Sequence, residues 1–368
     1  MRLYNPNIFV KFVTACVSIL VFGSCVKQVS LDIRTPTPQL VVDGLLLTDT
    51  TPCKVTLSYS GIFNSAGGQV QNFINDATVF VKDATGDSTQ LYNVGSGVYQ
   101  SASNINAKVG GAYSLSIMLY NGKHYVSVPE TILAVPQDIS LDSTGNSEYI
   151  PNNLTNPYPL YAAIMHIKTQ DPANEKNYYK WLTTCWVPRS ALGITGPPCD
   201  GTGQAVCFQY CFQNFEDSSI HILSDAGIDG AEIRYQSVFV APYFYWGNNY
   251  ISIKQLSLTE KAFQFWQLYQ QQTTNTGGVL DPLPASLNGN IYNANDSTDI
   301  ALGYFGCSDV ASLKFIFILK FTNHSHDYLL SNIGHYQGLG ACYLTYAPAT
   351  TNAPPGWETA PNYIVDIY

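Results

Sequence analysis

The chain has 368 residues and a formal net charge of −9, and only 12% of its residues are charged. This acidic balance disfavours nucleic acid as a partner, because proteins that bind nucleic acid present basic surfaces. The polarity comes mainly from uncharged side chains, and the 26 Tyr and 17 Phe residues are typical of exported proteins built from Tyr-rich β-strands.

The first 24 residues have the pattern of a targeting segment. Arg2 and Lys11 are the only charged residues before Cys25, and residues 12–22 form an apolar run that is too short to span a bilayer. The small residues Gly23 and Ser24 before Cys25 resemble a bacterial lipobox. We therefore expect removal of residues 1–24 and acylation of Cys25, which anchors the chain in a membrane. The alternative is an ordinary secretory signal in which Cys25 has no special role.

Residues 25–38 form a proline-containing tether, and short alternating runs separated by turn residues follow it. Asn121-Gly122 between the last two runs is a strong hairpin signal. Seven short strands in this space predict an immunoglobulin-like β-sandwich over residues 39–135. The predicted strands are 40–47, 54–60, 77–83, 89–94, 97–101, 113–119 and 123–128.

The remaining chain, residues 136–368, predicts a larger β-domain that is a sandwich or barrel-like. One amphipathic helix is expected near residues 258–273, where Ser257 and Glu260 have the spacing of a capping box. Its apolar stripe could be a binding face, but packing against the sheet is the favoured interpretation. The stripe consists of Ala262, Phe265, Trp266 and Tyr269, and the expected strands are 161–169, 178–187, 232–240, 250–258, 301–308 and 313–321.

The cysteines favour disulfides, because an exported chain lies in an oxidising compartment. We expect up to three bridges in the second half of the chain, with Cys53 free and buried. The sequence leaves the pairing open. A zinc site at Cys199, Cys207 and Cys211 is the weaker alternative, since the chain contains no CxxC motif. The candidate disulfide cysteines are Cys185, Cys199, Cys207, Cys211, Cys307 and Cys342.

Other polar motifs do not predict a metal site. Two histidines stand at alternate positions in residues 323–327, and residues 293–299 carry oxygen ligands at alternate positions. The second segment lacks the central glycine and the distal Glu of an EF-hand loop. We interpret the first as a polar strand end and the second as a turn, with metal binding as the alternative for each.

Known catalytic motifs are missing, so we expect a protein that is not an enzyme and that has no cofactor. The sequence contains no GxSxG, HExxH or SxxK pattern. The densest aromatic stretch, residues 241–250, could form a stacking platform for a sugar or a peptide at Tyr243, Tyr245 and Trp246. The alternative is that strand alternation buries half of these rings.

Three segments together carry a resemblance to a known family. They are "TPTPQLVVDGLL", "PCKVTLSYSGIF" and, most specifically, the block around the helix with its continuation "TGGVLDPLPASLNGNI" and "LGYF". The chain resembles the Bacteroidota lipoprotein family catalogued as domain of unknown function 4249. The family has no established activity, and its members are often encoded beside TonB-dependent outer-membrane transporters.

This resemblance implies an outer-membrane lipoprotein that acts as a non-enzymatic accessory or binding module of a TonB-dependent transporter. A free-standing surface lipoprotein that binds glycan or protein, like an adhesin, is the alternative. Many members carry acidic residues after the lipid-bearing cysteine, whereas this chain has "VKQVS". The sequence therefore leaves the periplasmic and the cell-surface face of the membrane both open.

Overall fold

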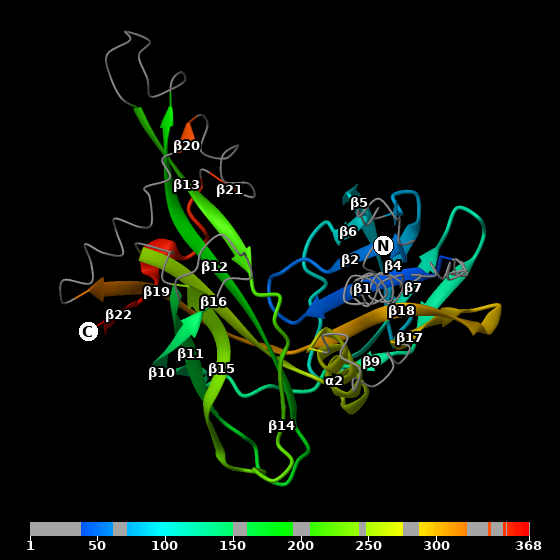
Figure 1. Ribbon diagram of the computed structural model, residues 1–368. Coiled ribbons are helices and arrows are strands. Elements are labelled where there is room, and N and C mark those ends of the chain that lie inside the picture. The colour runs from blue at the N-terminus through cyan, green and yellow to red at the C-terminus, as the bar shows by residue number, and fades with distance from the viewer. Residues whose placement is uncertain are drawn as a thin grey trace, which may run out of the picture.

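The computed structural model describes residues 38–61, 72–149, 160–193, 207–242, 248–274, 287–321, 338–339, 349–350 and 352–367. The prediction of a mainly β chain is confirmed, and all thirteen strands expected above are present. Figure 1 shows two β-rich parts side by side with α2 between them. No helix among the described residues is long and apolar enough to cross a membrane.

The first part is a closed barrel of nine strands, because β1 pairs with both β18 and β2. Two short strands, β3 (Asn72–Phe73) and β9 (Glu130–Thr131), pair with β2 and β7 outside the ring. The ring runs in the order β1 (Leu40–Leu47), β18 (Asp296–Ser308), β17 (Asn288–Asn293), β8 (His124–Ser127), β7 (Ala112–Met118), β4 (Thr78–Asp83), β5 (Ser88–Gly95), β6 (Val98–Ser101) and β2 (Lys54–Tyr59).

Seven of these strands come from the predicted sandwich region, whereas β17 and β18 come from far along the chain. β18 lies parallel to β1, with Val42 opposite Gly303 and Gly44 opposite Phe305. The alternating residues of the ring fill one core, in which Val42, Leu57 and Phe305 are fully buried. The motif "LNGNI…LGYF" thus forms two strands that complete the barrel.

Two glycines of that motif allow the strands to approach closely. A Cβ on Gly303 would lie 2.0 Å from the carbonyl oxygen of Val42, and the φ of Gly303 is +90°. A Cβ on Gly289 would lie 1.5 Å from the carbonyl oxygen of Gly303. A side chain at either position would push β18 away from its neighbours.

The predicted Asn121-Gly122 hairpin joins β7 and β8. Gly122 has a φ of +83°, and the backbone N–H of Lys123 donates to Asn121 Oδ1 at 3.0 Å. The turn therefore uses the positive φ of glycine and the side chain of asparagine in the way that this dipeptide predicts.

The second part is a sandwich of two sheets. The smaller sheet has the order β10 (Ser140–Tyr149), β11 (Leu160–Gln170) and β15 (Glu232–Pro242). The larger sheet has the order β21 (Ala349–Thr350), β13 (Cys207–Glu216), β12 (Tyr178–Gly193), β16 (Asn248–Ser257), β19 (Val310–Phe321) and β22 (Asn362–Ile367), and β14 (His221–Ser224) and β20 (Gly338–Leu339) pair with β12. A short 3₁₀ helix, η1 (Trp357–Thr359), precedes β22.

Residues from both sheets share the sandwich core. Met165 on β11, Ile253 on β16 and Phe315 on β19 are completely buried in it. Trp181 satisfies its buried indole N–H by donating to Gln255 Oε1 at 3.0 Å. Burial of one face of each sheet leaves the opposite face of β12 and β16 to meet the barrel.

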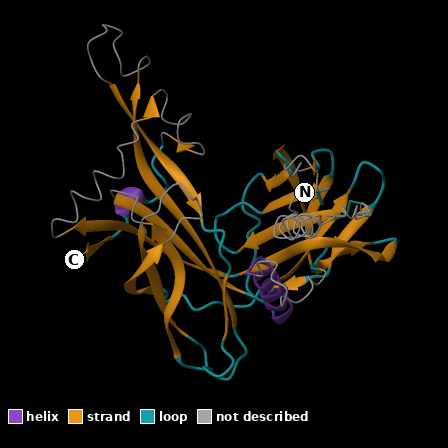
Figure 2. Ribbon diagram, viewed as in Figure 1, coloured by secondary structure: helices purple, strands orange, loops and turns teal. Residues whose placement is uncertain are grey.

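The predicted helix near residues 258–273 is α2 (Glu260–Thr274), the α-helix visible in Figure 2 among strands and loops. The expected capping box is wrong. Thr259 caps the helix instead, because its Oγ1 accepts from the N–H of Ala262 at 3.2 Å. The hydroxyl of Ser257 is occupied elsewhere, since it donates to the carbonyl of Leu133 at 2.6 Å and accepts from the N–H of Asp309 at 3.0 Å.

Candidate ligand-binding cleft

A cavity of about 370 Å³ lies between the barrel and the sandwich. Strands β1, β2 and β18 form its barrel wall, β12 and β16 form its sandwich wall, and α2 closes one side. This volume falls in the range of small-molecule pockets, and such pockets are common between structural units.

Strand register places the side chains of the sandwich wall. Lys180 on β12 pairs with Leu256 on β16, and two residues further along Leu182 pairs with Lys254. Residues two apart on a strand share one face, so these four side chains line the cavity. The intervening residues, such as Trp181 of β12, point into the sandwich core.

Leucines form the apolar surface of the cleft. Leu47 of β1 and Leu256 of β16 pack in one buried cluster with Val310, and Leu45 and Leu182 pack against it. This cluster joins the barrel to the sandwich and gives the cavity a hydrophobic wall.

Lys180 is the buried charge of this cleft. The residue is 8% exposed, and its Nζ lies 2.9 Å from the ring centroid of Trp266 on α2. Burial lowers the pKa of Lys180 to about 7, with Asp43 of β1 acting in the opposite direction. Among the described residues, no carboxylate forms an ion pair with this lysine.

A second lysine ties the two parts together. Lys254 Nζ of β16 donates to Asp49 Oδ2 at 2.8 Å and to Thr51 Oγ1 at 2.7 Å. Burial alone would raise the pKa of Asp49, but the hydrogen bonds from Lys254 and Thr51 hold it below its usual value. The carboxylate of Asp49 therefore already neutralises the charge of Lys254.

Asp217, beyond the end of β13, is also paired. Its Oδ2 lies 2.9 Å from His221 Nε2, and its Oδ1 accepts from the N–H of Ser219 at 2.9 Å. Burial raises the pKa of Asp217, but these hydrogen bonds outweigh burial and keep the pKa below the ordinary value.

Helix α2 is fixed through a buried glutamate. Glu130 of β9 is 3% exposed and accepts from Tyr304 Oη of β18 at 2.5 Å and from Thr259 Oγ1 at 2.8 Å. Ala262 and Phe265 of the predicted stripe pack on Tyr304, whereas Tyr269 is 37% exposed. The stripe is thus mainly a packing face, and it orients Trp266 toward Lys180.

The disulfide prediction needs correction at two of the six candidate cysteines. Cys185 and Cys307, both candidate disulfide residues, are free and buried, as is Cys53. Cys185 lies in the core of the sandwich and Cys307 in the core of the barrel, so they cannot meet. Burial raises the pKa of Cys53 and of Cys185 to about 12.

The other cysteines leave the pairing open. Cys211 is buried and is not a free thiol. Cys199, Cys342 and the side chain of Cys207 lie outside the described residues, so the remaining disulfides, and the zinc alternative, stay predictions.

Three other predicted features also lie outside the described residues. These are the anchor residue Cys25, the aromatic platform of Tyr243, Tyr245 and Trp246, and the histidine-containing segment 323–327.

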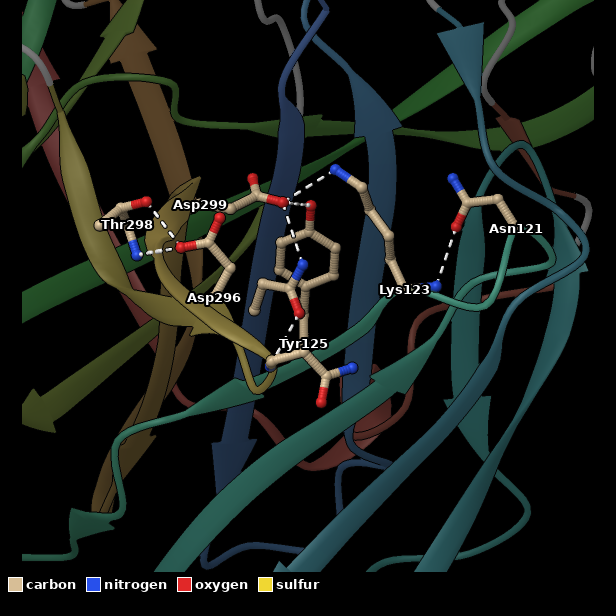
Figure 3. Close-up of polar contacts among 8 residues, drawn as sticks. Asn121, Lys123, Tyr125, Asp296, Thr298 and Asp299 are labelled. Carbon is tan, nitrogen blue, oxygen red and sulfur yellow. Dashed lines mark hydrogen bonds and ion pairs between the residues drawn. The ribbon is translucent and has the colours of Figure 1, made fainter.

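The segment 293–299 contains the end of β17, the turn to β18 and the first residues of β18 (Figure 3). Asp296 Oδ1 accepts from the N–H and the hydroxyl of Thr298 at 3.0 and 2.6 Å. Asp299 Oδ2 accepts from Lys123 at 2.8 Å and from Tyr125 at 2.9 Å. These oxygens therefore stabilise the turn and join it to β8, which accounts for them without a calcium ion.

Another group of carboxylates was not predicted from the sequence. Atoms of Asp171, Asp225 and Asp229 lie within 4.8 Å of one another. Asp171 accepts from Tyr179 Oη and from the N–H of Gly230, and the N–H groups of Asn177 and Asn174 donate to Asp225 and Asp229. The group joins two loops of the sandwich, and these hydrogen bonds explain it.

Comparison with known proteins identifies the family of the chain. The chain belongs to the family described as "Domain of unknown function (DUF4249)", whose model matches residues 26–314. No curated protein matches the chain significantly. Among solved structures, the two fibronectin type-III domain segment from chicken tenascin matches with 16% identity and a TM-score of 0.15, covering 60% of this chain and 91% of that one.

Proposed function

We propose that this protein is a lipid-anchored, non-enzymatic binding module of the bacterial outer membrane and an accessory of a TonB-dependent transporter. The observation that carries the binding part is the cleft between the barrel and the sandwich, which combines a leucine wall with a buried lysine. The anchor rests on the lipobox-like residues before Cys25. The proposed association with a transporter is based on the resemblance to lipoproteins of Bacteroidota that are encoded beside such transporters.

The two parts form a suitable frame for such a cleft. The ion pair of Lys254 with Asp49 and the hydrogen bonds of Ser257 join β16 to segments of both parts. A pocket whose walls are fixed in advance loses little free energy to ordering when a ligand binds. The cleft would then present a ligand at the membrane, close to the transporter.

Anchoring is tested by fractionating cells that carry the wild-type chain or Cys25→Ala. The wild-type chain should sediment with the outer membrane and incorporate labelled fatty acid, because several acyl chains hold a protein stably in a bilayer. The Cys25→Ala chain should be soluble and unlabelled. Cys53→Ala, which removes a buried thiol, is the matched control and should sediment as the wild type does. Full sedimentation and labelling of Cys25→Ala would refute the anchor.

A further inference from the structure

The ammonium group of Lys180 is buried in the cleft without a carboxylate partner among the described residues. Transfer of a charged group from water into a protein interior is unfavourable by on the order of several kcal/mol, unless an opposite charge compensates for the lost hydration. Trp266 offers only the face of its ring. A lysine in this position is costly for folding, which makes it a candidate for ligand binding.

The other charges of the cavity do not take this role. Lys254 is paired with Asp49 and Asp217 with His221. Asp43 on β1, Lys54 on β2 and Glu216 on β13 line the cavity but are exposed to solvent. Within the described part of the cleft, Lys180 is therefore the buried charge that remains for a ligand.

Leucines and a tryptophan supply much of the surface around Lys180. Leu182 and Leu256 flank it on β12 and β16, and Leu45 and Leu47 lie on the barrel wall. Trp266 adds an aromatic face above the ammonium group. A ligand that matches both features has one negative group and an apolar body.

We propose that this cavity binds a hydrophobic monocarboxylate, whose carboxylate pairs with the ammonium group of Lys180 and whose apolar body lies against the leucines and Trp266. This inference deepens the proposed function, because it takes the cleft as the ligand site. An anion beside the buried ammonium group supplies the charge-assisted hydrogen bonds that no described residue provides there.

The proposal includes a link to pH. A bound carboxylate favours the charged lysine and so raises the pKa of Lys180 from about 7. The exposed Asp43, Lys54 and Glu216 and the paired Lys254 and Asp217 also line the cavity, but none of them loses water as Lys180 does. Binding above pH 7 should therefore take up close to one proton per ligand, and affinity should fall as the pH rises.

The test is calorimetric titration of the full chain carrying Cys25→Ala, which needs no detergent, with sodium octanoate. Octan-1-ol and octylammonium carry the same tail without the negative charge. Octanoate should bind about tenfold or more tightly than either, and two buffers with different heats of ionisation should reveal proton uptake at pH 8. Equal binding of the three compounds would overturn the proposal without any variant of the site.

Lys180→Met keeps an unbranched side chain of most of the length and removes the charge. It should weaken octanoate binding about tenfold or more and abolish proton uptake. Lys82→Met, at an exposed position of β4 outside the lining of the cavity, is the control and should change the affinity less than about twofold. Unchanged octanoate binding by a folded Lys180→Met chain would contradict the proposal. Copurification with a transporter is a separate result, so either claim can fail while the other stands.

Discussion

Single residues of the cleft combine packing with an electrostatic cost. Glu130 is buried, and its carboxyl oxygens accept hydrogen bonds from Tyr304 and Thr259. Lys180 is also buried, its ammonium group faces the ring of Trp266, and no described carboxylate forms an ion pair with it. The contrast separates a buried residue that stabilises the fold from one that lowers the free energy of unfolding.

Lys180→Met should therefore stabilise the chain at and below neutral pH, by about 1–4 kcal/mol, as replacement of buried ions often does. The folded-state pKa of Lys180 is lowered from 10.5 to about 7. Between these values the unfolded chain binds a proton that the folded chain does not, so the wild-type stability rises with pH. The advantage of the variant should thus be largest below pH 7 and shrink toward pH 10.

Urea unfolding of both proteins over this pH range measures the difference, because all other titrating groups are common to them. A variant that is less stable than the wild type at every pH would show that Lys180 contributes to folding rather than opposing it.

At the scale of elements, alternation and turn residues predicted the strands, because each strand buries every second side chain and ends at recognisable turns. The Asn121-Gly122 hairpin is the clearest case. The pairing of β1 with β18 was not predicted, since about 260 residues separate them and periodicity reports only local structure. The signal that could have indicated it is the glycine-containing "LNGNI…LGYF" motif, whose glycines permit the close approach.

Gly303→Ala should destabilise the barrel by about 3 kcal/mol or more, because the new Cβ meets the carbonyl oxygen of Val42 and the residue has a positive φ. Gly86→Ala is the matched control, since Gly86 also has a positive φ but nothing lies within 4 Å of an added Cβ. It should cost about 1 kcal/mol. Chemical denaturation compares them, and equal losses would show that the approach of β18 to β1 is not tight.

At the scale of the whole molecule, the cleft arises where two separately packed cores meet. The barrel core and the sandwich core are distinct, and their contact is made by the leucine cluster, the Lys254–Asp49 pair and α2. The sequence predicted the helix and indicated that its apolar stripe packs against the sheet. It did not predict the cleft, because Lys180, Lys254 and Trp266 are brought together only by pairing of β12 with β16 and by docking of α2.

The predicted aromatic platform lies outside the described residues, and the cleft that we propose as a ligand site does not include it. The prediction that Cys185 and Cys307 form disulfides was wrong, because the sequence does not show that each is buried in a core as a free thiol.

The measurement that tests the proposed function most directly is copurification from gently solubilised outer membranes with a C-terminal tag, followed by mass spectrometry. We expect a TonB-dependent transporter in stoichiometric amount with the wild-type chain, and its loss with Cys25→Ala, because this variant leaves the membrane. A wild-type chain that emerges from the outer membrane alone would contradict the accessory role and leave a free-standing surface module in its place.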